Sequence, residues 1–222
     1  MTRTIAIVDQ DRQSGGPSIF LLVASAGYHV HSFADGKAFL AAELPQPADC
    51  VLLDMPLPGA DGLDLLRALA RRQDPPAIVV TSDSGDVALA VEAMKLGATD
   101  FLEKPCRPAV LLGAIDQACA RREQLLLAAG TQRQAAARLA PLSTRMRQVL
   151  RSVALGRANK VIAYELGLSV RTVEAYRAQM FAKLGVRTTA EAIRIAFAAG
   201  VEFFNPDCQV TPDASGWRLP GP

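Results

Sequence analysis

The sequence has little of what would support a disulfide-linked, metal-stabilised or membrane-spanning protein. Its four cysteines are scattered among 222 residues, with no Cys-x-x-Cys pair and no histidine cluster nearby. We therefore expect reduced thiols that fill apolar space, and we exclude a disulfide framework or a zinc site. No charge-free apolar run reaches the ~18 residues of a membrane span, and the first residues do not resemble a signal peptide. The expected location is the cytoplasm, with no membrane partner.

Aromatic residues are also scarce, at 5% of the chain, whereas hydrophobic residues make up 50%. The net charge of +2 conceals an asymmetry between the two halves. Residues 1–122 contain 11 Lys and Arg against 15 Asp and Glu, whereas residues 123–222 contain 13 against 7. An acidic half joined to a basic half indicates two domains with different tasks, one of which involves a polyanion.

The acidic half alternates strand-like and helix-like segments. The strand-like segments are 5–8, 28–33, 50–53, 77–80 and 100–102, and the helix-like segments are 17–26, 36–42, 63–72, 87–96 and 108–120. This alternation predicts right-handed crossovers and a doubly wound, five-stranded parallel sheet with helices on both faces. The predicted fold class of residues 1–122 is therefore α/β, of the flavodoxin-like type.

Polar side chains follow the strand-like runs at the points where those runs end. They are Asp9 and Asp11, Asp54, Thr81 and Lys104. In parallel sheets the carboxyl ends of the strands form one edge, so we expect these side chains to converge there. Carboxylates suit Mg²⁺, a lysine and a hydroxyl suit a phosphoryl group, and a carboxylate can be the nucleophile. The pattern predicts phosphoryl transfer onto Asp54.

These residues resemble the receiver domain of bacterial two-component response regulators. The match lies in Asp54-Met55-Pro56-Leu57-Pro58-Gly59-Ala60-Asp61-Gly62, in Val79-Val80-Thr81 and in Asp100-Phe101-Leu102-Glu103-Lys104-Pro105. The resemblance implies that Asp54 is the phospho-acceptor, Lys104 its phosphoryl partner, Thr81 the switch hydroxyl and Phe101 the switch aromatic. It also implies Mg²⁺ held by Asp9, Asp54 and the backbone carbonyl of Pro56, and a cis Lys104–Pro105 bond. Ser82 is an alternative for the hydroxyl role.

One departure from the receiver pattern lies beside Asp9. The family usually has two adjacent acids after the first strand, whereas this chain has Asp9 and Gln10. Gln10 offers a neutral amide oxygen in place of a carboxylate, and Asp11 is the other candidate ligand. We therefore expect weaker Mg²⁺ binding and slower phosphorylation than in relatives with both acids.

The basic half is expected to be helical throughout. Residues 123–140 predict a helical linker, and residues 141–202 predict an all-α unit of four helices, 144–155, 159–166, 170–184 and 190–199. Ser143 or Thr144, Ser169 and Thr189 are the expected N-caps. Proline, glycine and aspartate within residues 203–222 indicate a disordered tail. The basic third helix, 170–184, suits helix-turn-helix DNA binding.

The helical half resembles the LuxR-type helix-turn-helix family. The match lies in Leu142–Leu150, Asn159-Lys160-Val161-Ile162-Ala163, Ser169–Glu174 with Arg177, and Lys183-Leu184-Gly185-Val186. Together the halves resemble the FixJ/NarL class, nearer to FixJ. The resemblance implies a DNA surface of ten residues: Asn159, Lys160, Arg171, Thr172, Glu174, Ala175, Arg177, Ala178, Gln179 and Lys183. Of these, Glu174, Ala175 and Ala178 would face bases and the others would hold or flank phosphates. Glu174 could instead be a helix-dipole acid.

The leading interpretation is a transcription factor that a histidine kinase phosphorylates on Asp54. By analogy with the class, it would dimerise through the fourth helix and fifth strand, bind promoter DNA and act on RNA polymerase. The alternative is a DNA-binding regulator that works without phosphorylation, because Gln10 alters the metal site. A third interpretation, an Mg²⁺-dependent phosphohydrolase, would need a second acid two residues after Asp54, where the chain has Pro56. We therefore expect a regulator and not an enzyme.

Overall fold

The computed structural model describes residues 2–9, 19–55 and 62–201. The chain divides into two compact units, residues 1–126 and 127–222. Each unit is treated by itself below. Gln10, Asp11, Pro56 and the predicted tail lie outside the described residues.

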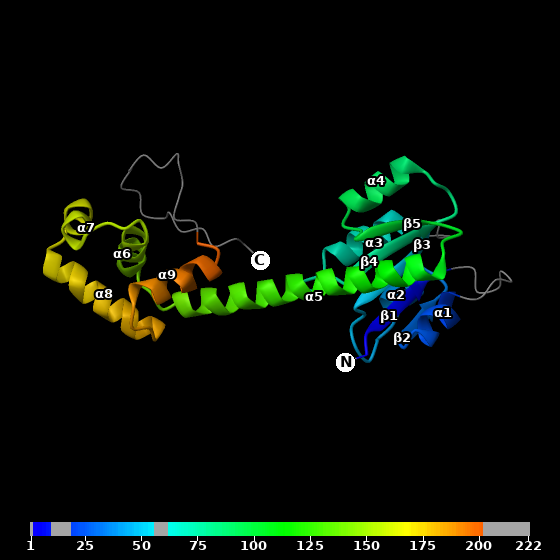
Figure 1. Ribbon diagram of the computed structural model, residues 1–222, viewed down its shortest axis with the longest axis horizontal. Helices are drawn as coiled ribbons and strands as arrows, with labels where there is room; N and C mark the ends of the chain where they lie inside the picture. Colours follow the sequence, from blue (N-terminus) through cyan, green and yellow to red (C-terminus); the bar gives the residue numbers. More distant parts are fainter. Residues whose placement is uncertain (1, 10–18, 56–61, 202–222) are drawn as a thin grey trace. The chain divides into compact units, whose positions relative to one another are not determined.

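The first unit contains a five-stranded parallel sheet (Figure 1), as the sequence predicts. The strand order is β2-β1-β3-β4-β5. The strands are β1 (Thr4–Val8), β2 (His29–Phe33), β3 (Cys50–Met55), β4 (Ala77–Ser82) and β5 (Asp100–Glu103). Since the order changes direction at β1, the edge of the sheet between β1 and β3 is a topological switch point, where α/β sheets bind ligands.

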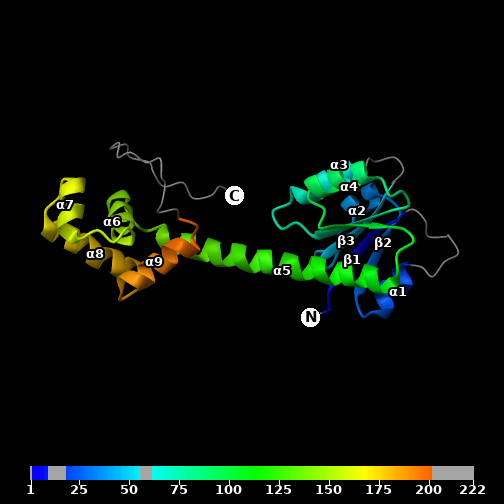
Figure 2. The same ribbon diagram turned by 45° about the horizontal axis from the view of Figure 1, so that its top comes forward.

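Helices cover both faces of this sheet (Figure 2). They are α1 (Ile19–Ser25), α2 (Gly36–Ala41), α3 (Gly62–Ala70), α4 (Val87–Lys95) and the first part of α5 (Pro108–Leu139). The side chains of central strand β3 alternate between the two faces of the sheet, so both faces need a cover of helices. Val51 and Leu53 lie in one apolar cluster with α2, α3 and α4, whereas Cys50 and Leu52 lie in a second cluster with α1 and α5. A strand that is buried on both faces has a continuous apolar sequence, as residues 50–53 do.

Helix α5 is a single helix of 32 residues, without a break between its predicted helical part and the predicted linker. Leu111 and Ile115 are buried in the first unit, whereas Ala135 and Leu139 are buried in the second. The division between the units falls at Leu126 and Leu127, inside the predicted linker. In the part of the chain that the structure describes, no helix is both long and apolar enough to cross a bilayer.

Charged side chains fasten α5 to the amino edge of the sheet. The Arg122 guanidinium donates to the Pro75 carbonyl at 2.9 Å and to Asp49 at 3.1 Å. Asp116 accepts from Arg3 at 2.9 Å and from the Tyr28 hydroxyl at 2.6 Å. Burial and the hydrogen bond to Asp116 raise the pKa of Tyr28 to about 12. These contacts hold α5 in register with the strands at the edge opposite Asp54.

The second unit contains four short helices after α5. They are α6 (Thr144–Ala154), α7 (Asn159–Leu166), α8 (Val170–Leu184) and α9 (Thr189–Ala198). Ser143 caps α6 and Ser169 caps α8, as predicted, because each hydroxyl accepts a backbone N–H of the first turn. Leu150, Met180 and Ala196 are completely buried in the core they share.

The predicted cap of the last helix is wrong by one residue. Thr188 and not Thr189 is the N-cap of α9, where its hydroxyl accepts the Glu191 N–H at 3.2 Å. The Glu191 carboxylate accepts the Thr188 N–H in return, which completes a capping box. Of two adjacent threonines, the one that precedes a Glu by three residues satisfies this pattern.

We predict that Thr188→Ala lowers the free energy of unfolding of the helical unit by about 1 kcal/mol, because the first turn of α9 loses its cap. Thr144→Ala is the matched control, since Thr144 lies in the first turn of α6 but Ser143 supplies that cap. Urea unfolding followed by circular dichroism would measure both. Equal losses for the two variants would contradict the assignment of the cap.

Candidate functional site

Asp54 occupies the carboxyl end of central strand β3. Strand register pairs Asp54 with Thr81 on β4, and Thr81 in turn with Leu102 on β5. Lys104 follows the end of β5, and Asp9 follows the end of β1. The parallel sheet thus brings residues from four strands to one edge, as the sequence predicts for Asp9, Asp54, Thr81 and Lys104.

Two side chains contact the Asp54 carboxylate directly. The Lys104 Nζ lies 2.6 Å from Asp54 Oδ1, and the Thr81 hydroxyl donates to the same oxygen at 3.1 Å. The side chains of Asp54 and Lys104 are only 12% and 18% exposed. The acceptor, the lysine and the hydroxyl predicted from sequence therefore form one buried cluster.

Electrostatics in this pocket favour bound protons. Desolvation raises the pKa of Asp54, and the charge of Asp9 adds to the effect, whereas Lys104 and Thr81 oppose it. Burial lowers the pKa of Lys104, but the hydrogen bond and charge of Asp54, with the charge of Asp9, outweigh burial and raise it. Desolvation is therefore the main cause of the raised pKa of Asp54, whereas the neighbouring carboxylates are the cause of the raised pKa of Lys104.

The acidic pocket fits a hard divalent cation. Asp9 is close enough to Asp54 to raise its pKa, and a cation between the two carboxylates would relieve that repulsion. Mg²⁺ is commonly held by one or two carboxylates and several waters. No group of three or more His, Cys, Asp or Glu arranged for a metal occurs within residues 2–9, 19–55 and 62–201. Asp9 and Asp54 are the two predicted metal ligands that lie in the described part of the chain.

The Thr81 and Ser82 hydroxyls at the end of β4 have different hydrogen-bond partners. Ser82 is buried and hydrogen-bonds Ser84, whose N–H also donates to the Ser82 hydroxyl at 3.2 Å. Thr81 therefore contacts Asp54, whereas Ser82 contacts Ser84. Sequence reasoning overlooked Asp83, whose charge acts on Lys104. The signal was present, since Asp83 also follows the end of a strand.

Phe101 lies on β5, half-buried, at a groove beside α4. The groove has a volume of about 650 Å³ and is lined by Gly85, Asp86, Val87, Ala90, Val91, Met94, Lys95, Phe101 and Glu103. Val87, Val91 and Met94 are apolar side chains that α4 exposes to solvent. The predicted switch aromatic thus adjoins the surface that the sequence predicts for dimerisation.

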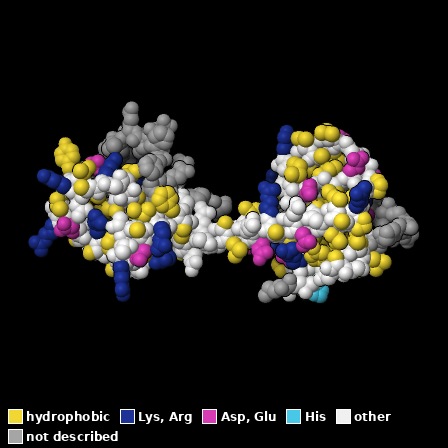
Figure 3. Space-filling model, in the orientation of Figure 1, with side chains coloured by type: hydrophobic (Ala, Val, Ile, Leu, Met, Phe, Trp, Pro, Cys, Tyr) yellow, Lys and Arg dark blue, Asp and Glu magenta, His cyan; other side chains and the backbone are white. Residues whose placement is uncertain are grey.

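The second unit exposes basic side chains over its surface (Figure 3). Seven of the predicted DNA-binding residues are exposed, namely Lys160, Arg171, Glu174, Ala175, Ala178, Gln179 and Lys183. Those on α8 share one side of the helix, because Val173, Met180 and Leu184 occupy the buried side. Small side chains at Ala175 and Ala178 leave room for close approach to a groove of DNA.

Four of the predicted DNA-binding residues have partners within the unit. Arg177 donates to Asn159 and to Thr189, at 2.7 and 2.9 Å. The Thr172 hydroxyl lies 2.8 Å from the Ser169 hydroxyl at the cap of α8. Lys183 donates to the Pro141 carbonyl at 2.9 Å. Tyr176 packs against two apolar clusters.

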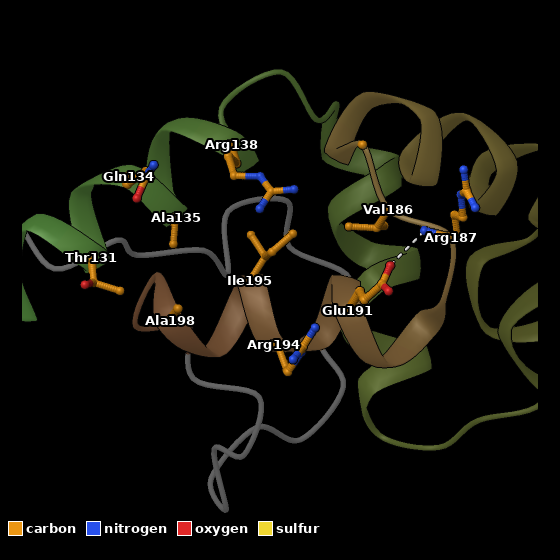
Figure 4. A pocket seen from close by; sticks show the side chains of 11 residues that line it. Thr131, Gln134, Ala135, Arg138, Val186, Arg187, Glu191, Arg194, Ile195 and Ala198 are labelled. Atoms are coloured by element: carbon orange, nitrogen blue, oxygen red, sulfur yellow. Dashed lines mark hydrogen bonds between the residues drawn. The ribbon is translucent and has the colours of Figure 1, made fainter.

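A groove of about 630 Å³ separates α9 from the end of α5 (Figure 4). Arg138 and Gln134 line it from α5, and Arg194 and Ile195 line it from α9. Glu191 also lines it and accepts the Arg187 N–H at 2.8 Å. None of the predicted DNA-binding residues lines this groove.

Comparisons with known proteins agree with both halves. Residues 5–116 match the response regulator receiver domain, and residues 140–196 match the luxR family of bacterial regulatory proteins. The transcriptional regulatory protein FixJ of Bradyrhizobium diazoefficiens is 41% identical over 89% of this chain and 96% of its own. FixJ of Azorhizobium caulinodans is 40% identical over 89% and 93%. The structure of response regulator StyR covers 89% of this chain and 99% of its own, with 34% identity and a TM-score of 0.70.

We predict that Asp54→Asn stabilises the first unit at neutral pH without Mg²⁺. Folding raises the pKa of Asp54, so its contribution to stability is full below the unfolded value of 3.8 and is lost as pH rises through the folded pKa. Asparagine avoids that loss, and we expect the melting temperature at pH 7 to rise by roughly 4 °C.

The difference should shrink as the pH approaches 3.8. Asp64→Asn is the control, because Asp64 is an exposed partner of Arg67 and should give a small loss. A lower melting temperature for Asp54→Asn would show that the ion pair with Lys104 outweighs desolvation.

Proposed function

We propose a phosphorylation-switched mechanism for this chain, which belongs to the family of two-component response regulators that join a receiver domain to a LuxR-type DNA-binding domain. A cognate histidine kinase phosphorylates Asp54, the receivers then dimerise, and the dimer binds promoter DNA and acts on RNA polymerase in the cytoplasm. The observation that carries the proposal is the buried cluster of Asp54, Lys104 and Thr81 at the carboxyl edge of the sheet.

Asp54 is the nucleophile in this mechanism. A carboxylate oxygen attacks the phosphorus of the kinase phosphohistidine, the P–N bond breaks, a P–O bond forms, and the histidine takes a proton. Lys104, already 2.6 Å from Asp54 Oδ1, neutralises charge on the phosphoryl oxygens. Asp9, Asp54 and the Pro56 carbonyl, with Gln10 or Asp11, would hold Mg²⁺, whose positive charge would offset the negative charge of the transferred group.

The switch starts from Thr81 and reaches α4. In the unmodified chain the Thr81 hydroxyl lies 3.1 Å from Asp54. A phosphoryl group on Asp54 adds acceptor oxygens, and the hydroxyl moves to hydrogen-bond one of them. Phe101 lies on the neighbouring strand at the groove beside α4, so its rotation would change the shape of that groove. The apolar side chains of Val87, Val91 and Met94 then form the dimer surface, and dimerisation biases the equilibrium toward the active state.

The exposed side of α8 reads DNA in this proposal. Arg171 and Lys160 neutralise phosphates, whereas Ala175 and Ala178 admit the helix to the major groove. Glu174 accepts a hydrogen bond from a cytosine amino group. The phosphate backbone of the bound DNA lies beside Thr172, Gln179 and Lys183.

The test of phosphorylation is intact mass after incubation with Mg²⁺ and acetyl phosphate. We expect one phosphoryl group on the wild-type chain and none on Asp54→Asn. Lys104→Ala should lower the rate of adduct formation by roughly 100-fold, because the phosphoryl charge loses its neutralising ammonium.

An adduct on Asp54→Asn would place the acceptor elsewhere. No adduct on the wild type, with acetyl phosphate or with a kinase, would favour a regulator that binds DNA without phosphorylation. Gln10 beside Asp9, where relatives usually have a second acid, is the observation that favours this second candidate. Sustained release of phosphate would instead indicate a phosphohydrolase.

We predict that Val91→Asp prevents dimerisation without preventing phosphorylation. A buried aspartate at the α4 surface should weaken the phosphorylated dimer at least about tenfold, as measured by analytical ultracentrifugation. Leu21→Asp is the matched control, since Leu21 is an exposed apolar side chain on α1, away from this surface. Dimerisation that survives Val91→Asp but not Leu21→Asp would move the interface to α1.

A further inference from the structure

We propose that Arg177 positions the recognition helix and does not bind a DNA phosphate. Its side chain connects α8 to α7 and to α9, and these two connections fix how α8 lies against its neighbours. The inference rests on DNA binding through α8, which the salt dependence of the wild-type chain tests separately.

The contacts of Arg177 join three helices at one point. Nη1 donates to Asn159 Oδ1, on the first residue of α7, at 2.7 Å. Nη2 donates to Thr189 Oγ1, on the first residue of α9, at 2.9 Å. Arg177 itself lies in the middle of α8 and is half-buried. One side chain therefore links the start of each neighbouring helix to the centre of the recognition helix.

The guanidinium group suits this task better than an ammonium. Its N–H groups point in fixed directions, so a single planar group can hold two acceptors on different helices. Both acceptors are neutral, and hydrogen bonds from a charged donor are stronger than those between neutral groups. Lysine would keep the charge but lose the fixed geometry.

Arg171 provides the contrast on the same helix. It is exposed near the start of α8, and among the described residues the structure gives it no hydrogen bond or ion pair. Its guanidinium is therefore free to meet a phosphate, whereas two of the five N–H groups of Arg177 already hold Asn159 and Thr189. Sequence alone assigns both arginines to phosphate contacts. Their hydrogen bonds in the structure distinguish them.

The consequence concerns sequence discrimination. Phosphate contacts set affinity and its dependence on salt, whereas base contacts set specificity and require accurate placement of α8. Loss of a positioning residue should therefore reduce discrimination between sequences and leave the number of phosphate contacts unchanged. Loss of a phosphate ligand should do the reverse.

The experiment compares full-length Arg177→Ala with Arg171→Ala. The probes are a duplex that the wild-type chain enriches from a random pool and a mixed-sequence duplex. Dissociation constants are measured from about 50 to 200 mM salt, below the unfolding temperature of each variant. For Arg171→Ala we expect the slope of log K against log salt to fall by about 0.9 per lost contact, with discrimination retained.

For Arg177→Ala we expect an unchanged slope and a roughly tenfold loss of discrimination between the two duplexes. Arg177→Lys should lose discrimination as well, although it retains the charge. A slope reduced as in Arg171→Ala, or full activity of Arg177→Lys, would show that Arg177 binds phosphate. An unchanged slope with unchanged discrimination would show that it only stabilises the fold, and would also overturn the proposal.

A milder variant covers the case in which Arg177→Ala does not fold. Thr189→Val removes one acceptor of Arg177 and nearly preserves volume, and the cap of α9 stays intact because Thr188 supplies it. We expect a smaller loss of discrimination, of about threefold, with an unchanged salt slope. Wild-type discrimination by a folded Thr189→Val would contradict the bridge to α9.

Discussion

The burial of β3 on both faces is the constraint on which the first unit depends. Its apolar residues alternate between two cores, so the strand can only lie at the centre of a covered sheet. Parallel pairing with β1 and β4 then places Asp54 next to Thr81 at the carboxyl edge of the sheet. Asp54 brings the end of this strand into the polar cluster, and the apolar packing of the strand holds that end in place.

The same sheet separates two kinds of electrostatic contact. At the carboxyl edge, the Asp54 carboxylate contacts Lys104 and Thr81, and the charge of Asp9 adds to the rise in its pKa. At the amino edge, Arg122 and Asp116 have partners that fasten α5 to the strands. The first edge is arranged for chemistry, and the second holds the helix that continues into the next unit.

In the helical unit, the hydrogen-bond partners of a charged side chain distinguish its proposed role better than its charge does. Arg171 and Arg177 lie on one helix and would be equivalent in any count of basic residues. Arg177 hydrogen-bonds Asn159 and Thr189, so its charge is held between helices, whereas Arg171 faces solvent. In the proposed function, Arg171 attracts DNA, whereas Arg177 shapes the surface that presents such residues.

The sequence by itself determined the fold class and the acidic cluster, because the relevant patterns are local. Apolar runs that end in Asp54 or Thr81 identify strand ends, Ser143 and Ser169 identify helix starts, and a parallel sheet brings strand ends together. Only the tertiary structure decided the hydrogen-bond partners of Arg177 and the different partners of Ser82 and Thr81. Each depends on the direction of a side chain across elements that are distant in sequence, and packing sets that direction.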